Sequence, residues 1–71
     1  MADSVYKFIE LVGASSESWE KAAAAAVNQA SKSVRDLRVG EIVQFDVTIE
    51  NGKIKSYRAK VKLSFKIESK K

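Results

Sequence analysis

The side chains that could do chemistry in this 71-residue chain are carboxylates and cations, because the sequence contains neither His nor Cys. This excludes an imidazole acid–base catalyst, a Ser-His-Asp triad, a thiolate zinc site and a disulfide. Two carboxylate pairs lie close in sequence, Glu17 with Glu20 and Asp46 with Glu50. We interpret them as a helix start and as strand-edge charges, since catalytic carboxylates need a burial that this pattern does not predict. The three glycines are isolated, so no phosphate-binding glycine loop is present, and we do not expect an enzyme.

A row of cations occupies alternate positions close to the C-terminal end of the sequence, at Arg58, Lys60, Lys62 and Lys66. Such a row is typical of the solvated face of a half-buried strand, where lysines also discourage edge-to-edge aggregation. The functional alternative is an anion site for a phosphate, a nucleotide or a nucleic-acid backbone. A basic nucleic-acid-binding module is the least favoured alternative, because the net charge is only +4 and the aromatic Tyr57 and Phe65 belong to the opposite face.

The composition is that of a folded protein, with 45% hydrophobic and 31% charged residues. Lys or Glu interrupts every long apolar run, and the opening MADSVYKFIE lacks the basic and apolar regions of a signal peptide. We therefore expect one cytoplasmic domain spanning residues 1–71. A chain this short gathers little hydrophobic core and has no disulfide or zinc to compensate, so we expect oligomerisation to supply the missing stability.

The elements that must position the polar residues follow from the hydrophobic periodicity. An apolar and aromatic stretch predicts a first strand over Val5–Val12, ended by Gly13. Ser16 is the expected N-cap of a helix over Glu17–Arg35, in which apolar residues recur every three or four positions. The run Ala22–Ala26 has two interpretations: helix propensity alone, or close packing of the helix on the sheet or on another subunit.

A hairpin is expected to complete the chain. Its first strand covers Val39–Glu50, where strict alternation puts Glu41 on one face and Gln44 on the other. The dipeptide Asn51-Gly52 predicts a type I′ turn, because both residues tolerate a positive φ. In the strand that follows and ends at Ile67, the cations share one face and the apolar residues share the other, at Tyr57, Ala59, Val61, Leu63 and Phe65.

These elements predict an α+β fold of order β-α-β-β. A helical crossover leaves the first and second strands parallel, and the third strand pairs antiparallel between them, so the sheet order is 1-3-2. One helix can cover only one face of this three-stranded antiparallel sheet. The first strand is apolar on both sides, with Tyr6, Phe8 and Val12 opposite Ile9 and Leu11. The uncovered apolar surface predicts an obligate homo-oligomer.

Three stretches of the sequence carry a family resemblance. VYKFIELVGASSESWEKAAAAAV contains a strand that ends in Val-Gly-x-Ser and leads into a capped, alanine-rich helix. VRDLRVGEIV joins the helix to the second strand, and GKIKSYRAKVKLSFKIE supplies the third strand. In order, spacing and total length, these stretches resemble the dodecins over nearly the whole chain.

The resemblance implies a small cytoplasmic flavoprotein that assembles into a hollow homododecamer. Dodecins bind riboflavin, lumichrome or FMN in pairs at subunit interfaces, and they are thought to store the flavin or to quench its photochemistry. In the flavin-binding members, a Trp near the start of the second strand stacks on the isoalloxazine ring. A Gln after the Tyr of the third strand hydrogen-bonds the pyrimidine edge of that ring.

In this sequence the stacking position is Val39 and the amide position is Arg58. Val39 has no π face, which removes a stacking contact worth roughly 1–3 kcal/mol. Arg58 only donates hydrogen bonds, whereas an amide also accepts them, although Arg58 could reach a phosphate with two N–H groups. We therefore expect weakened flavin binding, with four candidate binding residues: Val39, Arg58, Glu41 and Gln44.

The combination of Val39 and Arg58 resembles a branch of the family without the stacking Trp, which includes the calcium dodecins. The sequence contains no dedicated calcium loop, so a cation would need carboxylates such as Glu41, Asp46 or Glu50 gathered from several subunits. Three alternatives to flavin storage stay open: another anionic ligand, a metal ion such as calcium, and a mainly structural shell.

Overall fold

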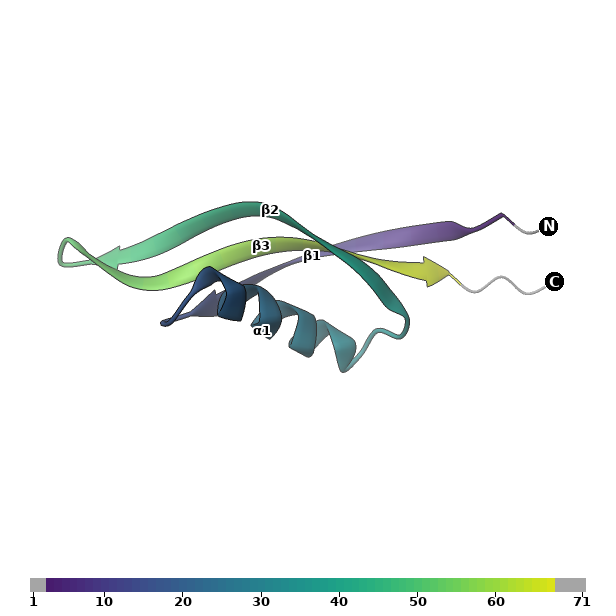
Figure 1. The fold of residues 1–71 in the computed structure, drawn as a ribbon, viewed down its shortest axis with the longest axis horizontal. Helices are drawn as coiled ribbons and strands as arrows, with labels where there is room; N and C mark the ends of the chain where they lie inside the picture. Colours follow the sequence, from purple (N-terminus) through teal and green to yellow (C-terminus); the bar gives the residue numbers. More distant parts are fainter. Residues whose placement is uncertain (1–2, 68–71) are drawn as a thin grey trace.

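One helix lies along one face of a long three-stranded sheet (Figure 1). The computed structural model describes residues 3–67. The elements follow the order β1 (Val5–Ser15), α1 (Trp19–Ser31), β2 (Leu37–Glu50) and β3 (Lys53–Ile67). β3 pairs antiparallel with both β1 and β2, so the sheet order is β1-β3-β2. The predicted α+β fold with its 1-3-2 sheet is confirmed.

The core between α1 and the sheet is built from small side chains. Ala22, Ala26 and Ala30 of α1 are buried against the middle of β3. The largest fully buried side chains are Leu63 and Val61. Side chains of this size bury little apolar area, so the core that one subunit gathers is thin.

At Gly13, the backbone of β1 lies directly against the backbone of α1. A Cβ at this position would collide with the carbonyl oxygen of Ala22 and lie 3.1 Å from the amide nitrogen of Ala26. The alanines of α1 therefore permit close packing on β1, one of the two interpretations of the alanine run. Ala24 and Ala25 are exposed, and at these two positions helix propensity is the sufficient reason for alanine.

The helix is shorter than predicted at both ends. β1 continues to Ser15, and Ser18 is the N-cap in place of the predicted Ser16, with its Oγ accepting from the amide of Lys21 at 3.0 Å. The helix ends at Ser31 and not near Arg35. The chain then turns through Asp36, whose φ of 64° is left-handed, and enters β2.

The predicted hairpin turn is confirmed, but the predicted strict alternation of β2 is wrong. Asn51 and Gly52 both have positive φ, as a type I′ turn requires. The register then shifts at three places, because Lys55, Val43 and Arg38 each stand between two successive pairs of the β2–β3 ladder without a partner of their own. A bulge of this kind adds one residue to a strand and reverses the faces of the residues beyond it.

Among the residues that the structure describes, no helix is long and apolar enough to cross a membrane.

Candidate functional site

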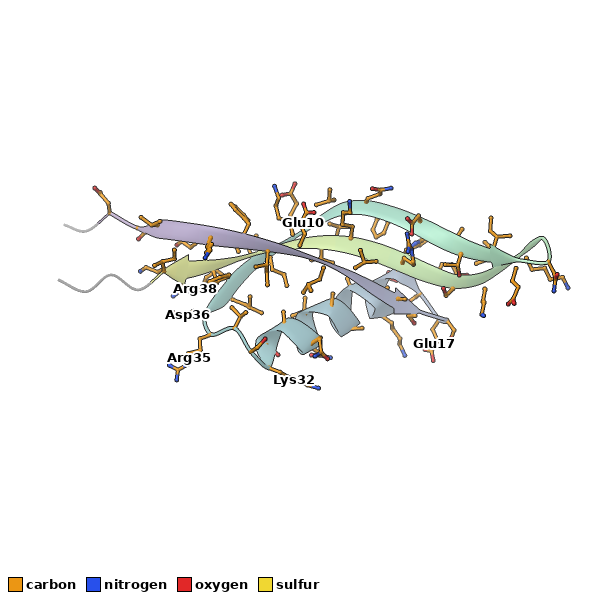
Figure 2. All side chains as sticks on the ribbon, turned by 180° about the vertical axis from the view of Figure 1, so that it is seen from behind. Glu10, Glu17, Lys32, Arg35, Asp36 and Arg38 are labelled. Atoms are coloured by element: carbon orange, nitrogen blue, oxygen red, sulfur yellow. The ribbon has the colours of Figure 1, made fainter. Side chains whose placement is uncertain are left out.

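The sheet face turned away from α1, here called the open face, carries most of the polar residues singled out in the sequence. Residues paired across a ladder share a face, and Ala59, Val61 and Leu63 of β3 face the helix, so their neighbours along the strand face away. Glu10 of β1 is seen on this side of the sheet (Figure 2). The open face comprises Tyr6, Phe8, Glu10, Val12 and Ala14 of β1, Val39, Glu41, Gln44, Asp46 and Thr48 of β2, and Arg58, Lys60, Lys62, Ser64 and Lys66 of β3.

All four candidate binding residues lie on the open face. Val39 pairs with Ser64, and Glu41 pairs with Lys62. The bulge at Val43 then brings Gln44 to the same face, opposite Lys60, whereas strict alternation would have turned it toward the helix. Arg58 stands opposite Asp46. The structure therefore gathers the four residues along two neighbouring strands.

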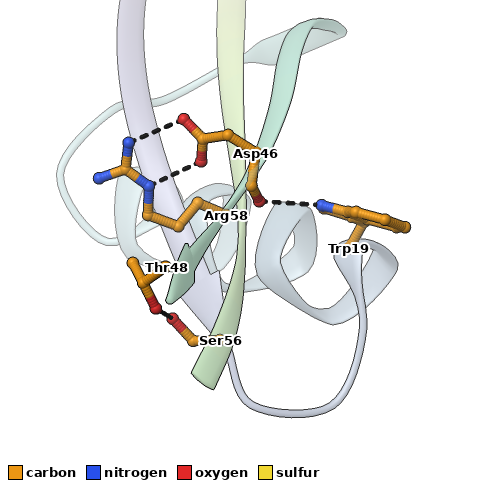
Figure 3. A network of polar contacts seen from close by, with 5 residues as sticks. All are labelled: Trp19, Asp46, Thr48, Ser56 and Arg58. Carbon is orange, nitrogen blue, oxygen red and sulfur yellow. Dashed lines mark hydrogen bonds and ion pairs between the residues drawn. The ribbon is translucent and has the colours of Figure 1, made fainter. Parts of the chain in front are cut away.

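Asp46 and Arg58 form a two-pronged ion pair in the middle of the β2–β3 hairpin (Figure 3). Nε of Arg58 donates to one carboxylate oxygen of Asp46 at 2.7 Å, and Nη2 donates to the other at 2.8 Å. The hydrogen bonds from Arg58 hold the pKa of the Asp46 carboxyl below its ordinary value, and Asp46 raises the pKa of the guanidinium in turn. Arg58 is thus already engaged before any ligand arrives.

The backbone of Asp46 is anchored from the helix side of the sheet. The indole N–H of Trp19, the first residue of α1, donates to the carbonyl oxygen of Asp46 at 3.1 Å (Figure 3). The Trp19 ring packs against Tyr57 at 5.0 Å and Phe45 at 5.4 Å between ring centroids. Trp19 is thus a packing residue, and it couples the start of α1 to the ion pair on the open face.

The lysine row is interleaved with carboxylates and aromatic residues contributed by the flanking strands. Lys62 stands between Glu10 and Glu41 in the two ladders, and its Nζ lies 5.1 Å from the centroid of the Phe8 ring. Tyr6 is paired with Lys66. The alternation within β3 alone puts Tyr57 and Phe65 on the opposite face and does not reveal the aromatic residues of β1. The signal that reveals them is the β1–β3 register, which puts every second residue of β1 beside the cations.

The open face also carries exposed apolar side chains. Phe8 is 57% exposed and Val39 is 61% exposed, and Val12 next to Lys60 is exposed as well. Exposed apolar side chains that alternate with polar groups are the surface expected of an interface or a ligand site.

Carboxylates on this face do not form a metal site by themselves. Within residues 3–67, no three or more Asp, Glu, His or Cys side chains come close enough together to hold a metal ion. Asp46 is paired with Arg58, and Glu50 is paired with Lys55 at 3.2 Å. Of the three carboxylates proposed as cation ligands, only Glu41 forms no ion pair within the part of the chain that the structure describes.

Both the sequence and the fold of this chain match known proteins. A family model described as Dodecin matches residues 5–68. This chain belongs to the dodecin family. Among solved structures, the dodecin from Streptomyces coelicolor superposes with a TM-score of 0.90 at 31% identity, covering 99% of this chain and 100% of that one.

Two curated dodecins are similar in sequence. The calcium dodecin of Mycobacterium tuberculosis is 48% identical over 65 residues, covering 90% of each protein. The dodecin of Thermus thermophilus is 38% identical over 64 residues, covering 90% of this chain and 93% of its own length. A crystal structure of the M. tuberculosis protein, described as calcium chelating with a novel calcium-binding site, superposes with a TM-score of 0.80 at 45% identity, covering 96% of this chain and 97% of that one.

Proposed function

We propose that this dodecin is a non-enzymatic storage protein that binds a flavin weakly where the open faces of neighbouring subunits meet. The observation that carries the proposal is the gathering of Val39, Glu41, Gln44 and Arg58 on one exposed face. The proposed assembly is a hollow homododecamer in the cytoplasm. One helix leaves the open face uncovered, and a second copy of the same face is the surface that a family of self-assembling proteins would bring to it.

The residues on the open face fit a flavin only in part. Gln44 offers an amide that both donates and accepts, as the pyrimidine edge of a flavin requires. Val39 offers an apolar wall without a π face. Phe8 supplies an aromatic ring on the other side of β3, since Val39 and Phe8 both pair with Ser64. Arg58 is engaged by Asp46. These contacts support flavin binding that is weaker than the binding of a flavin stacked on a Trp.

The test is a fluorescence titration of riboflavin and FMN with the assembled protein. We expect quenching at protein concentrations of tens of micromolar or more, since affinity falls about tenfold for each 1.4 kcal/mol of lost contact. The absence of quenching for both flavins over this range would reject flavin storage. Native mass spectrometry of freshly purified protein gives the number of subunits and shows whether a ligand is carried through purification.

Calcium is the second candidate ligand, and the 48% identity to a calcium dodecin over 90% of each protein favours it. Calcium prefers six to eight oxygen ligands, so about two or three subunits would have to contribute Glu41 around one ion. We expect calcium to raise the melting temperature and magnesium to raise it less. Glu41→Gln should remove the calcium effect, and an effect that survives this change would place the ion elsewhere.

Nucleic-acid binding receives little support from the open face. Glu10 and Glu41 flank Lys62, and Asp46 neutralises Arg58, so the cations do not form a continuous positive track. Binding of a single-stranded oligonucleotide that weakens steeply with salt would contradict this interpretation.

A further inference from the structure

The Asp46–Arg58 ion pair uses the geometry by which a guanidinium binds a phosphate. Two parallel N–H groups of Arg58 meet the two carboxylate oxygens of Asp46 at 2.7 and 2.8 Å. Phosphate oxygens would take the same two positions on the same fork. Asp46 thus fills the anion site of Arg58 from within the chain and cancels its charge.

We propose that Asp46 is the positioning residue that selects the charge of the ligand, by keeping Arg58 neutralised so that uncharged ring systems such as riboflavin are accepted in preference to phosphate-bearing ones such as FMN. The inference rests on the proposed function and deepens it, because it names the charge class of ligand that the same site accepts. Its chemical basis is that FMN differs from riboflavin by one phosphate, which carries a charge of about −1.5 to −2 at neutral pH.

Asp46 is held in a defined position, as a side chain that competes with a ligand for Arg58 must be. Its carbonyl oxygen is held by the Trp19 indole, and the β2–β3 ladder places it directly opposite Arg58. The positive charge of Lys60, the next cation along β3, also lowers the pKa of the Asp46 carboxyl. Removing the carboxylate would leave Arg58 and Lys60 as two neighbouring cations on an exposed apolar face, which is a receptor for an anion with an apolar body.

The experiment compares the dissociation constants of riboflavin and FMN for the assembled wild-type protein and for Asp46→Asn. The asparagine keeps the shape of the side chain and removes its charge. We expect the affinity ratio of FMN to riboflavin to rise by about tenfold or more, the factor that one charge-assisted contact supplies. Asp46→Glu keeps the charge and should retain the wild-type ratio. Glu50 lies on β2, as Asp46 does, and is paired with Lys55 of β3. Glu50→Gln breaks this other ion pair and should leave the ratio unchanged.

Arg58→Gln supplies a second test that does not depend on the folding of Asp46→Asn. In the wild-type background this change should move the FMN to riboflavin ratio less than about twofold, because the charge it removes is already cancelled, whereas in Asp46→Asn it should abolish the gain. A tenfold fall of the ratio in the Arg58→Gln single variant would overturn the inference, since Arg58 would then already be binding the phosphate. An unchanged ratio in Asp46→Asn would overturn it as well.

Inorganic phosphate separates this inference from the proposed flavin function. Trp19 is the sole tryptophan and donates to Asp46, so its emission reports on the site. If neither flavin binds to any variant, flavin storage is wrong. Phosphate should still change the Trp19 emission and raise the melting temperature of Asp46→Asn, but not of the wild type or of Asp46→Asn/Arg58→Gln. No response of Asp46→Asn to phosphate would overturn the inference by itself.

Discussion

At the scale of single residues, Val39 and Arg58, the two positions that we match to the flavin contacts of dodecins, differ in what they lack for flavin binding. Val39 lacks a π face, and Arg58 is engaged by a carboxylate of its own chain. The double variant Val39→Trp/Arg58→Gln should strengthen flavin binding by about 5- to 150-fold, the worth of one stacking contact of about 1–3 kcal/mol. Flavin quenching measures the gain. Val12→Trp/Arg58→Gln is the matched control, because it adds the same ring to the same face on β1 and should give a much smaller gain.

An assembled double variant without increased affinity would show that Val39 and Arg58 have been wrongly matched to the flavin-contact positions. The assembly state must therefore be measured on the same samples, by size-exclusion chromatography.

The ion pair also makes a residue-level prediction on pH. The hydrogen bonds and charge of Arg58, with a smaller contribution from Lys60, lower the pKa of Asp46 in the folded protein. A lowered folded pKa means that the pair stabilises the fold above the ordinary aspartate pKa of about 4, and that this stabilisation is lost as the pH falls through the lower folded value. The melting-temperature difference between the wild type and Asp46→Asn should be constant from about pH 7 to 5 and shrink below about pH 4. A difference that stays constant into strong acid would contradict the pairing.

The four candidate positions could be selected from the sequence, but the partner of Arg58 could not. A regular hairpin around Asn51-Gly52 would pair Asp46 with Tyr57 and would turn Gln44 toward the helix. The bulge at Lys55 moves Asp46 opposite Arg58, and the bulge at Val43 restores the register beyond it. Neither bulge carries a glycine or another local sequence signal, so the pairing of Asp46 with Arg58 could not be predicted from the sequence.

At the scale of the elements, Gly13 is the position where β1 and α1 depend most directly on each other. Gly13→Ala should destabilise the protein by about 1–3 kcal/mol or more, since the added methyl would meet the backbone of Ala22 and Ala26, which cannot move aside as a side chain can. Chemical denaturation measures the loss. Gly40→Ala is the matched control, because its Cβ would meet the flexible end of Leu63 at 3.1 Å. Equal losses for the two variants would contradict the close-packing explanation of the alanine run.

Element types, their order and the sheet order could be predicted from periodicity, capping residues and the Asn-Gly turn. The start of the helix could not be predicted, because Ser15, Ser16 and Ser18 all have a side chain that can act as an N-cap. Ser15 Oγ accepts from the amide of Glu17 at 3.0 Å, and Ser18 caps α1. Three serines with the same capping ability lie within four positions, so the local sequence does not decide among them.

At the scale of the whole molecule, we expect one subunit to bury too little apolar surface to be stable alone. Within residues 3–67, only six hydrophobic residues of small or medium size are buried, and a few partly buried ones pack against them. Phe8, Val39 and Phe45 are more than half exposed. Folding should therefore be coupled to association, and the melting temperature should rise with protein concentration. Phe8→Glu places a charge in the open face and should yield unfolded monomers, whereas Gln29→Glu on the exposed surface of α1 should leave the assembly intact. Circular dichroism and native mass spectrometry on the same samples test this, and a folded Phe8→Glu monomer in dilute solution would refute the coupling.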